Sequence, residues 1–157
     1  MTTTTSELFA IVDTASDPRL FGWVTACREY QCLFSGKLEP PLQAAAPYLV
    51  KLSKESLLYK AWQNEGWGKN WGIFCTSTAP IHELSKHFRQ FLSAKLPDGM
   101  IVQFRFYDPR VWRTYINTCS QADLKSWFAH VLEYIVEAED GTHSSRYKYS
   151  DGVLILI

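Results

Sequence analysis

The eight residues Phe104-Arg105-Phe106-Tyr107-Asp108-Pro109-Arg110-Val111 join two different periodic patterns. Over residues 100–107 the side chains fall into two alternating sets, which predicts a strand because every second position shares a face. Asp108 can then accept hydrogen bonds from the first free amides of a helix, and Pro109 suits the first helical position, where no N–H is needed. The stretch therefore predicts a strand, a cap and a helix in immediate succession.

Arg105 falls in the middle of this predicted strand, where the surrounding pattern indicates a covered position. A charge in such a position is tolerated only when it is paired and hydrogen-bonded. Asp17 and Asp108 are accounted for as helix caps, which leaves Asp13 at the end of the first predicted strand. We therefore expect an Asp13–Arg105 pair within the sheet layer, with Asp108 and Pro109 forming the structural turn into the helix.

Strand and helix patterns alternate along most of the chain. The strand patterns lie at residues 8–13, 30–34, 48–52, 71–76 and 101–107. The helical patterns begin near Asp17, Ser53, Pro80, Asp108 and Ser120. This alternation predicts a single α/β domain with a central mixed sheet flanked by about five helices.

Beyond residue 130 the helical period is lost. Residues 131–139, 146–149 and 153–157 have strand patterns, and Asp140-Gly141 and Asp151-Gly152 separate them. Asp-Gly is typical of two-residue hairpin turns. Residues 131–157 are therefore predicted to form an antiparallel β-meander that ends the one domain, residues 1–157.

The stretch 104–111 resembles the signature of the type VI secretion effector adaptor family, the Tap or TEC chaperones, long catalogued as a domain of unknown function. Three further segments match that family in the same order: Phe9–Asp13, Cys32–Gly36 and Ala46–Leu52. The resemblance covers residues 8–130 and implies a non-enzymatic bacterial chaperone in the cytoplasm. Such a protein would bind the N-terminal region of a secreted toxin and help to load it onto the VgrG spike. Many members continue into a helical C-terminal lobe that this sequence does not contain. Either the chain is a short member or the lobe has been removed, so no function of that lobe is carried over.

The composition limits the classes of partner. Sixteen basic residues balance sixteen acidic ones among 157, so no overall field attracts nucleic acid or an anionic membrane. The N-terminal residues lack the features of a signal peptide, and no apolar run reaches the roughly 18 residues of a membrane span. We therefore expect a cytoplasmic protein whose partners are other proteins.

Six tryptophans and an aromatic content of 15% exceed what a core of this size normally requires. Three of the tryptophans lie around Gly66 and Gly68, in a loop that either contacts a partner or folds back over the core. As the resemblance implies a binding surface, we also place the end of the signature stretch near it. The residues expected at this surface are Tyr107, Arg110, Trp62, Trp67 and Trp71.

The sequence predicts no catalytic residue, metal site or cofactor. His82 and His87 are five apart, so they lie about 140° apart around a helix and cannot reach one metal. No serine or cysteine lies in a recognisable nucleophile motif.

Two alternatives to an adaptor remain open. Asp13, Arg105 and Tyr107 could form the polar site of a small enzyme at the C-terminal ends of the strands, where open α/β sheets bind ligands. Residues 153–157, Val-Leu-Ile-Leu-Ile, could instead act as an edge strand that pairs with another chain in a larger assembly.

Overall fold

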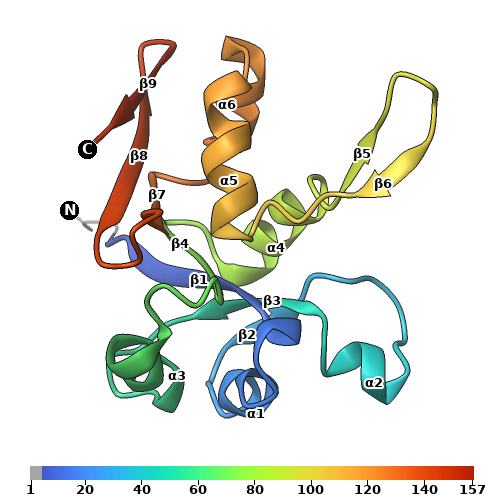
Figure 1. Cartoon of the computed structure of the whole chain (residues 1–157), viewed down its shortest axis with the longest axis vertical. Helices are drawn as coiled ribbons and strands as arrows, with labels where there is room; N and C mark the ends of the chain where they lie inside the picture. Colours follow the sequence, from blue (N-terminus) through green and yellow to red (C-terminus); the bar gives the residue numbers. More distant parts are fainter. Residues whose placement is uncertain (1–4) are drawn as a thin grey trace.

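A computed structural model describes residues 5–157, which contain a seven-stranded sheet with helices on both faces (Figure 1). The strands in order across the sheet are β2 (Tyr30–Cys32), β3 (Pro47–Lys51), β1 (Glu7–Asp13), β4 (Gly72–Ser77), β7 (Glu133–Glu137), β8 (Ser144–Ser150) and β9 (Val153–Leu156). The sheet is strongly twisted, so that β8 stands steeply to β1 in Figure 1. The C-terminal meander therefore extends the central sheet.

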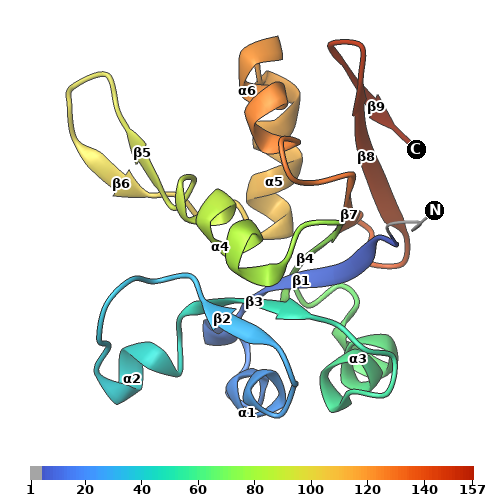
Figure 2. The ribbon, with the colours of Figure 1, turned by 180° about the vertical axis from the view of Figure 1, so that it is seen from behind.

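Helices cover the two faces of the sheet in two groups (Figures 1 and 2). One face carries α1 (Leu20–Thr25) and α3 (Leu57–Ala61), with the short α2 (Pro40–Gln43) beside them, and the other carries α4 (Ile81–Arg89), α5 (Pro109–Tyr115) and α6 (Gln121–Trp127). Short helical turns extend β1, α3 and α5: η1 (Thr14–Ser16), η2 (Trp62–Gly66) and η3 (Ile116–Thr118). None of the helices within residues 5–157 has the length and apolar character needed to span a membrane.

The central strand β1 is buried on both faces, which explains its continuous apolar sequence. Phe9 and Ile11 point into the core beneath α4, α5 and α6, whereas Ala10 and Val12 point into the core beneath α1 and α3. All four are at most 1% exposed. Because successive side chains of a strand alternate between faces, one strand supplies both cores.

The predicted α/β class and the C-terminal meander are confirmed. Asp151 and Gly152 have φ angles of 51° and 79°, and two successive positive values define the type I′ turn expected of Asp-Gly. The sheet differs from the prediction in one respect, since every neighbouring pair of strands runs antiparallel and none runs parallel in residues 5–157. The connections place each strand beside one of opposite direction, which the sequence pattern does not reveal.

The strand predicted over residues 101–107 is wrong in length and in place. Only β6 (Ile101–Gln103) is a strand, and it pairs with β5 (Ser93–Lys95) in a separate hairpin that projects from the body of the molecule (Figure 1). Ile101 is 71% exposed. The chain leaves the hairpin at Phe104 and makes a turn into α5, in which the Asp108 N–H donates to the Arg105 carbonyl at 3.0 Å. Alternation alone does not distinguish a projecting hairpin from a central strand.

The first turns of two helices show which residues cap them. Ser120 and Asp123 form a reciprocal capping box at the start of α6, where a helical start was predicted. Helix α3, however, is capped by Ser56, whose Oγ accepts the Tyr59 N–H at 3.1 Å, and not by Ser53. Ser53 lies one turn earlier, where its carbonyl accepts the Ser56 N–H instead.

His87 on α4 is buried beside α6. Its Nε2 lies 3.1 Å from the Trp127 carbonyl oxygen, and its ring centroid is 5.3 Å from that of His130. Burial, with a smaller contribution from the charge of His130, lowers the pKa of His87 to about 4. His87 is therefore neutral in the folded chain at pH 7.

We expect the folded chain to lose stability on acidification because of this histidine. Between its ordinary pKa of 6.5 and the folded value of about 4, His87 binds a proton only in the unfolded chain. The free energy of unfolding should therefore fall over this range by about 1.4 kcal/mol for each unit of pKa difference. Urea unfolding at about pH 7 and pH 4 should show a smaller fall for His87→Gln than for the wild type. An equal fall in the two proteins would contradict this assignment.

Candidate functional site

The carboxylate of Asp13 ends the central strand and meets Arg105. The Arg105 Nη2 donates to Asp13 Oδ2, and the Ala15 N–H donates to Asp13 Oδ1 at 3.2 Å. The Asp13 side chain is 4% exposed and that of Arg105 is 47% exposed. The structure thus brings together the two residues that the sequence predicts as a pair, although Arg105 lies after β6 and not within a strand.

Asp108 caps α5 and holds Arg110 at the same time. Asp108 Oδ1 accepts from the Arg110 backbone N at 2.9 Å and from its Nε at 3.0 Å, while Oδ2 accepts from Nη2 at 2.8 Å. Burial alone would raise the pKa of Asp108, but the hydrogen bonds from Arg110 outweigh it and lower that pKa. Pro109 fills the first helical position, as expected.

The same Asp-Pro-Arg arrangement occurs a second time, before α1. Asp17 Oδ1 accepts from the Arg19 backbone N at 2.9 Å and from its Nε at 3.1 Å, and Oδ2 accepts from Nη2 at 2.9 Å. The two units differ in burial, since the Asp17 side chain is 19% exposed and that of Asp108 is 7% exposed. Asp-Pro-Arg is therefore a local folding unit, and only the copy before α5 is part of the core.

The two buried ion pairs share one orientation, with the carboxylate inside and the guanidinium outside. Asp13 and Asp108 are 4% and 7% exposed at their side chains, whereas Arg105 and Arg110 are 47% and 64% exposed. An ion pair arranged in this way is neutral in sum but presents positive charge to solvent. The surface at the start of α5 is therefore cationic although the chain as a whole carries no net charge.

A third buried carboxylate, that of Glu137 on β7, lies near this cluster and was not expected from the sequence. Its Oε1 has no hydrogen-bond partner within the described part of the chain, and burial raises its pKa. The Arg113 Nη1 donates to its backbone carbonyl at 2.6 Å and so ties α5 to β7. The only sequence signal for Glu137 is its place in a strand whose neighbours are buried.

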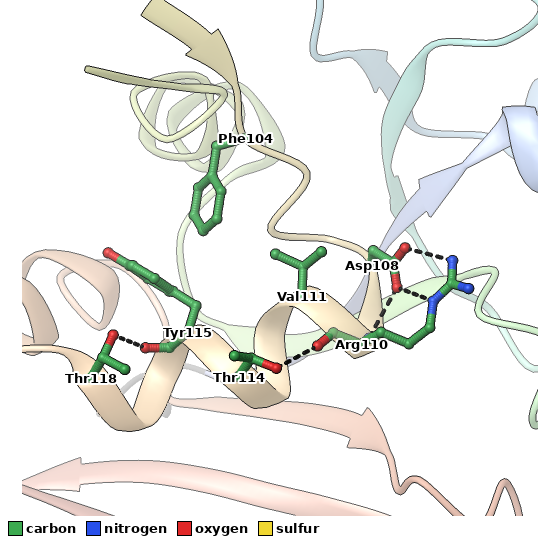
Figure 3. Close-up of a pocket in the computed structure, with 7 residues that line it drawn as sticks. All are labelled: Phe104, Asp108, Arg110, Val111, Thr114, Tyr115 and Thr118. Atoms are coloured by element: carbon green, nitrogen blue, oxygen red, sulfur yellow. Dashed lines mark hydrogen bonds and ion pairs between the residues drawn. The ribbon is translucent and has the colours of Figure 1, made fainter. Parts of the chain in front are cut away.

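An open groove of about 670 Å³ runs along the outer face of α5 from the Asp108–Arg110 pair (Figure 3). Its lining residues are Phe104, Asp108, Arg110, Val111, Thr114, Tyr115 and Thr118. The Phe104 ring, which follows β6, stands 4.7 Å from that of Tyr115 and bounds the groove on the side of the hairpin. The signature stretch therefore provides one end and part of the wall of this groove.

The hydroxyl groups in the groove wall are already hydrogen-bonded within the chain. Thr114 Oγ1 donates to the Arg110 carbonyl at 3.2 Å, and Thr118 Oγ1 donates to the Tyr115 carbonyl at 2.7 Å. The Tyr115 hydroxyl accepts from Trp127 Nε1 at 3.3 Å. The wall of the groove is consequently apolar in character, and its charged groups lie at one end.

Three of the five residues expected at a partner surface lie in the core. Trp62, Trp71 and Tyr107 are each at most 2% exposed. The rings of Trp62 and Trp71 pack against each other at 5.8 Å over Gly66, so the glycine-rich loop folds back onto the core. A partner cannot reach these side chains in the folded chain. The expectation of a partner contact stays a prediction for Arg110 and for Trp67, which is half-buried.

In this arrangement the carboxylates are buried and paired, and the guanidinium groups remain exposed. Asp13 and Asp108 are each engaged by an arginine, and residues 5–157 contain no group of three His, Cys, Asp or Glu side chains placed to hold a metal ion. His82, on the exposed side of α4, and the buried His87 do not approach one site. What the site offers chemically is an apolar groove with a cationic end.

Comparison with known proteins gives one match. A protein-family model described as "Domain of unknown function (DUF4123)" matches residues 8–126, which include β1, the signature stretch and α5. No curated protein and no solved structure matches the chain.

The Asp13–Arg105 pair can be tested by removing its exposed half. Arg105→Ala leaves the Asp13 carboxylate buried without a counter-charge, so we expect a loss of about 1–3 kcal/mol in the free energy of unfolding. The control is Lys51→Ala, because Lys51 pairs with the half-exposed Glu7 and Glu29 at 3.7 and 3.4 Å. Exposed pairs contribute less than about 1 kcal/mol. Denaturant unfolding that finds equal losses in the two variants would show that Asp13 does not depend on Arg105.

Proposed function

Because this chain belongs to the DUF4123 family, we propose that it is an adaptor chaperone of the type VI secretion system. It would bind a secreted effector through the N-terminal region of that effector and help to load it onto the VgrG spike. The observation that carries the proposal is the family match over residues 8–126, which contains the stretch 104–111 that resembles the signature of these adaptors.

The geometry of the signature stretch supports a binding role. Asp108 and Arg110 form one end of an apolar groove, and Phe104 forms part of its wall. Protein partners are typically held by an apolar centre with polar groups at its rim. The buried carboxylates Asp13 and Asp108 would support this geometry and would take no part in catalysis.

The proposed role also defines the setting of the protein. It would act in the bacterial cytoplasm, contact the effector and the spike, and use no metal, cofactor, nucleic acid or membrane. The balance of sixteen basic and sixteen acidic residues supports a protein partner over nucleic acid.

Co-expression with the toxin encoded beside a spike gene tests the proposal. We expect a complex that survives affinity purification and size exclusion and that is lost when the N-terminal segment of the toxin is deleted. Arg110→Glu should weaken the complex at least tenfold, because it replaces the exposed cation at the end of the groove with an anion.

The control is Arg28→Glu, the same charge reversal at an exposed position outside the groove lining, in the loop between β2 and α1, a helix on the opposite face of the sheet. It should leave the complex intact. The absence of any complex with the wild-type chain would contradict the adaptor role, and equal binding by wild type and Arg110→Glu would remove Arg110 from the contact.

A second candidate function is assembly through β9, which lies at an edge of the sheet. Ile157 exchanges both backbone hydrogen bonds with Arg146 of β8, at 3.0 and 2.9 Å. In an antiparallel pair, only every second residue directs its N–H and C=O groups toward the neighbouring strand. The N–H and C=O groups of Leu154 and Leu156 therefore point away from β8. Val153 and Leu156 are 59% and 55% exposed, so the edge has both the free backbone groups and the apolar side chains that strand addition uses.

Substitution of Leu156 tests this candidate without breaking the sheet. Leu156→Pro removes an N–H that faces outward, so it should prevent self-association while leaving the β8–β9 ladder in place. Leu156→Val keeps the N–H and should behave as the wild type. Light scattering coupled to size exclusion reports the mass. A wild-type chain that stays monomeric at high concentration would contradict assembly through β9.

A further inference from the structure

We infer that the groove along α5 binds an amphipathic α-helix of the partner protein, with carboxylate side chains of that helix placed against Arg105 and Arg110. The inference rests on the proposed adaptor function, since it specifies the chemistry of the effector segment that the adaptor would hold. The spacing of the groove residues, their hydrogen bonds and the exposed charge at one end support it.

Helix α5 and the turn η3 carry two separate stripes of side chains. Trp112 and Ile116 lie in the core and are at most 1% exposed. The groove stripe is Val111, Thr114, Tyr115 and Thr118, at positions i, i+3, i+4 and i+7. Side chains at this spacing form one continuous ridge along a helix, and such a ridge packs against a second helix. Figure 3 shows Val111 and Tyr115 on the side of α5 that faces Phe104.

The hydrogen bonding of the groove favours a helix over an extended segment. A bound strand gains most of its affinity from unpaired backbone groups of its host. Here the wall is the side of a helix, and the hydroxyl groups of Thr114, Thr118 and Tyr115 already have partners within the chain. A helix satisfies its own backbone and presents only side chains, so it loses no hydrogen bond on entering this groove.

The charges at the groove end determine the polarity of the partner. Asp108 and Arg110 are the only charged residues in the lining, and the guanidinium is the exposed member of that pair. The neighbouring Arg105 is likewise exposed while its partner Asp13 is not. Within residues 5–157, Arg110 Nη1 makes no hydrogen bond and is free to donate to a carboxylate. A partner helix with acidic residues at one end therefore complements the groove and binds in one direction.

Two matched substitutions on exposed helix surfaces test the groove. Thr114→Arg places a bulky cation in the middle of the apolar stripe, whereas Ser126→Arg makes the same change on α6, outside the groove lining. Both native hydroxyls donate to the carbonyl four residues earlier at 3.2 Å, so the local cost of losing them is the same. We expect Thr114→Arg to weaken the purified toxin complex at least tenfold by calorimetry and Ser126→Arg to change it less than twofold. Thermal unfolding should be the same for both variants.

Photo-crosslinking distinguishes a helical partner from an extended one. A diazirine analogue of leucine replaces Val111 in one sample and p-azidophenylalanine replaces Tyr115 in another, because both are close in size to the native groove residues, and the cross-linked toxin residues are identified by mass spectrometry. The two positions are about 6 Å apart along α5. A helical partner spans that distance with about four residues, and an extended partner spans it with about two. The cross-linked positions should therefore lie about four residues apart, in a segment with acidic residues at one end.

The outcomes distinguish a failure of the inference from a failure of the function on which it rests. Cross-links about two residues apart, or a complex unaffected by Thr114→Arg, would overturn the helix-in-groove inference and leave the adaptor role standing. If changing one acidic residue of the toxin to lysine restores its binding to the Arg110→Glu variant, the predicted polarity is supported. If no acidic residue of the toxin does so, that part of the inference is overturned. No complex with the wild-type chain would overturn the adaptor role and the inference together.

Discussion

The buried carboxylate of Asp13 is the constraint on which the arrangement of the sheet and the groove depends. It ends β1, the strand that serves both cores, and its guanidinium partner Arg105 lies on the segment that leads from the projecting hairpin into α5. A buried carboxylate without a counter-charge is costly, so the segment is held close to the end of β1. This attachment places the start of α5 beside the end of β1, and buried Trp112 and the Arg113 bond to the Glu137 carbonyl hold the rest of the helix against the sheet.

Much of the fold could be predicted from local chemistry. The unbroken apolar run of β1, the Asp108-Pro109 cap and the Asp-Gly turn at residues 151–152 each depend on residues that are adjacent in sequence. The alternation over residues 100–107 is equally clear, but it led to a wrong strand. Which strand a segment pairs with is decided by distant residues, and the alternating pattern carries no information about them.

The candidate site was predictable in part for the same reason. The Asp13–Arg105 pair could be inferred because a covered arginine needs an acid and Asp13 ends the first predicted strand. The groove could not be predicted, because Phe104 faces Tyr115 only when the residues before it form a separate hairpin and not a strand of the main sheet. The burial of Trp62 and Trp71 could not be predicted from the sequence either. A glycine-rich loop with large aromatic residues is equally typical of a contact surface and of a loop folded onto the core.

The separation of Asp13 and Arg105 by 92 residues has a consequence for how the chain folds. β1 is synthesised before β3, β4 and Arg105, so its apolar side chains have no complete set of neighbours until Arg105 has been made. Contacts between residues that are distant in sequence form slowly, because closing the loop between them costs conformational entropy. During this interval Phe9 to Val12 form an exposed apolar strand, which is the form most exposed to aggregation. A protein proposed to protect another chain would thus itself depend on rapid completion of its own sheet during translation.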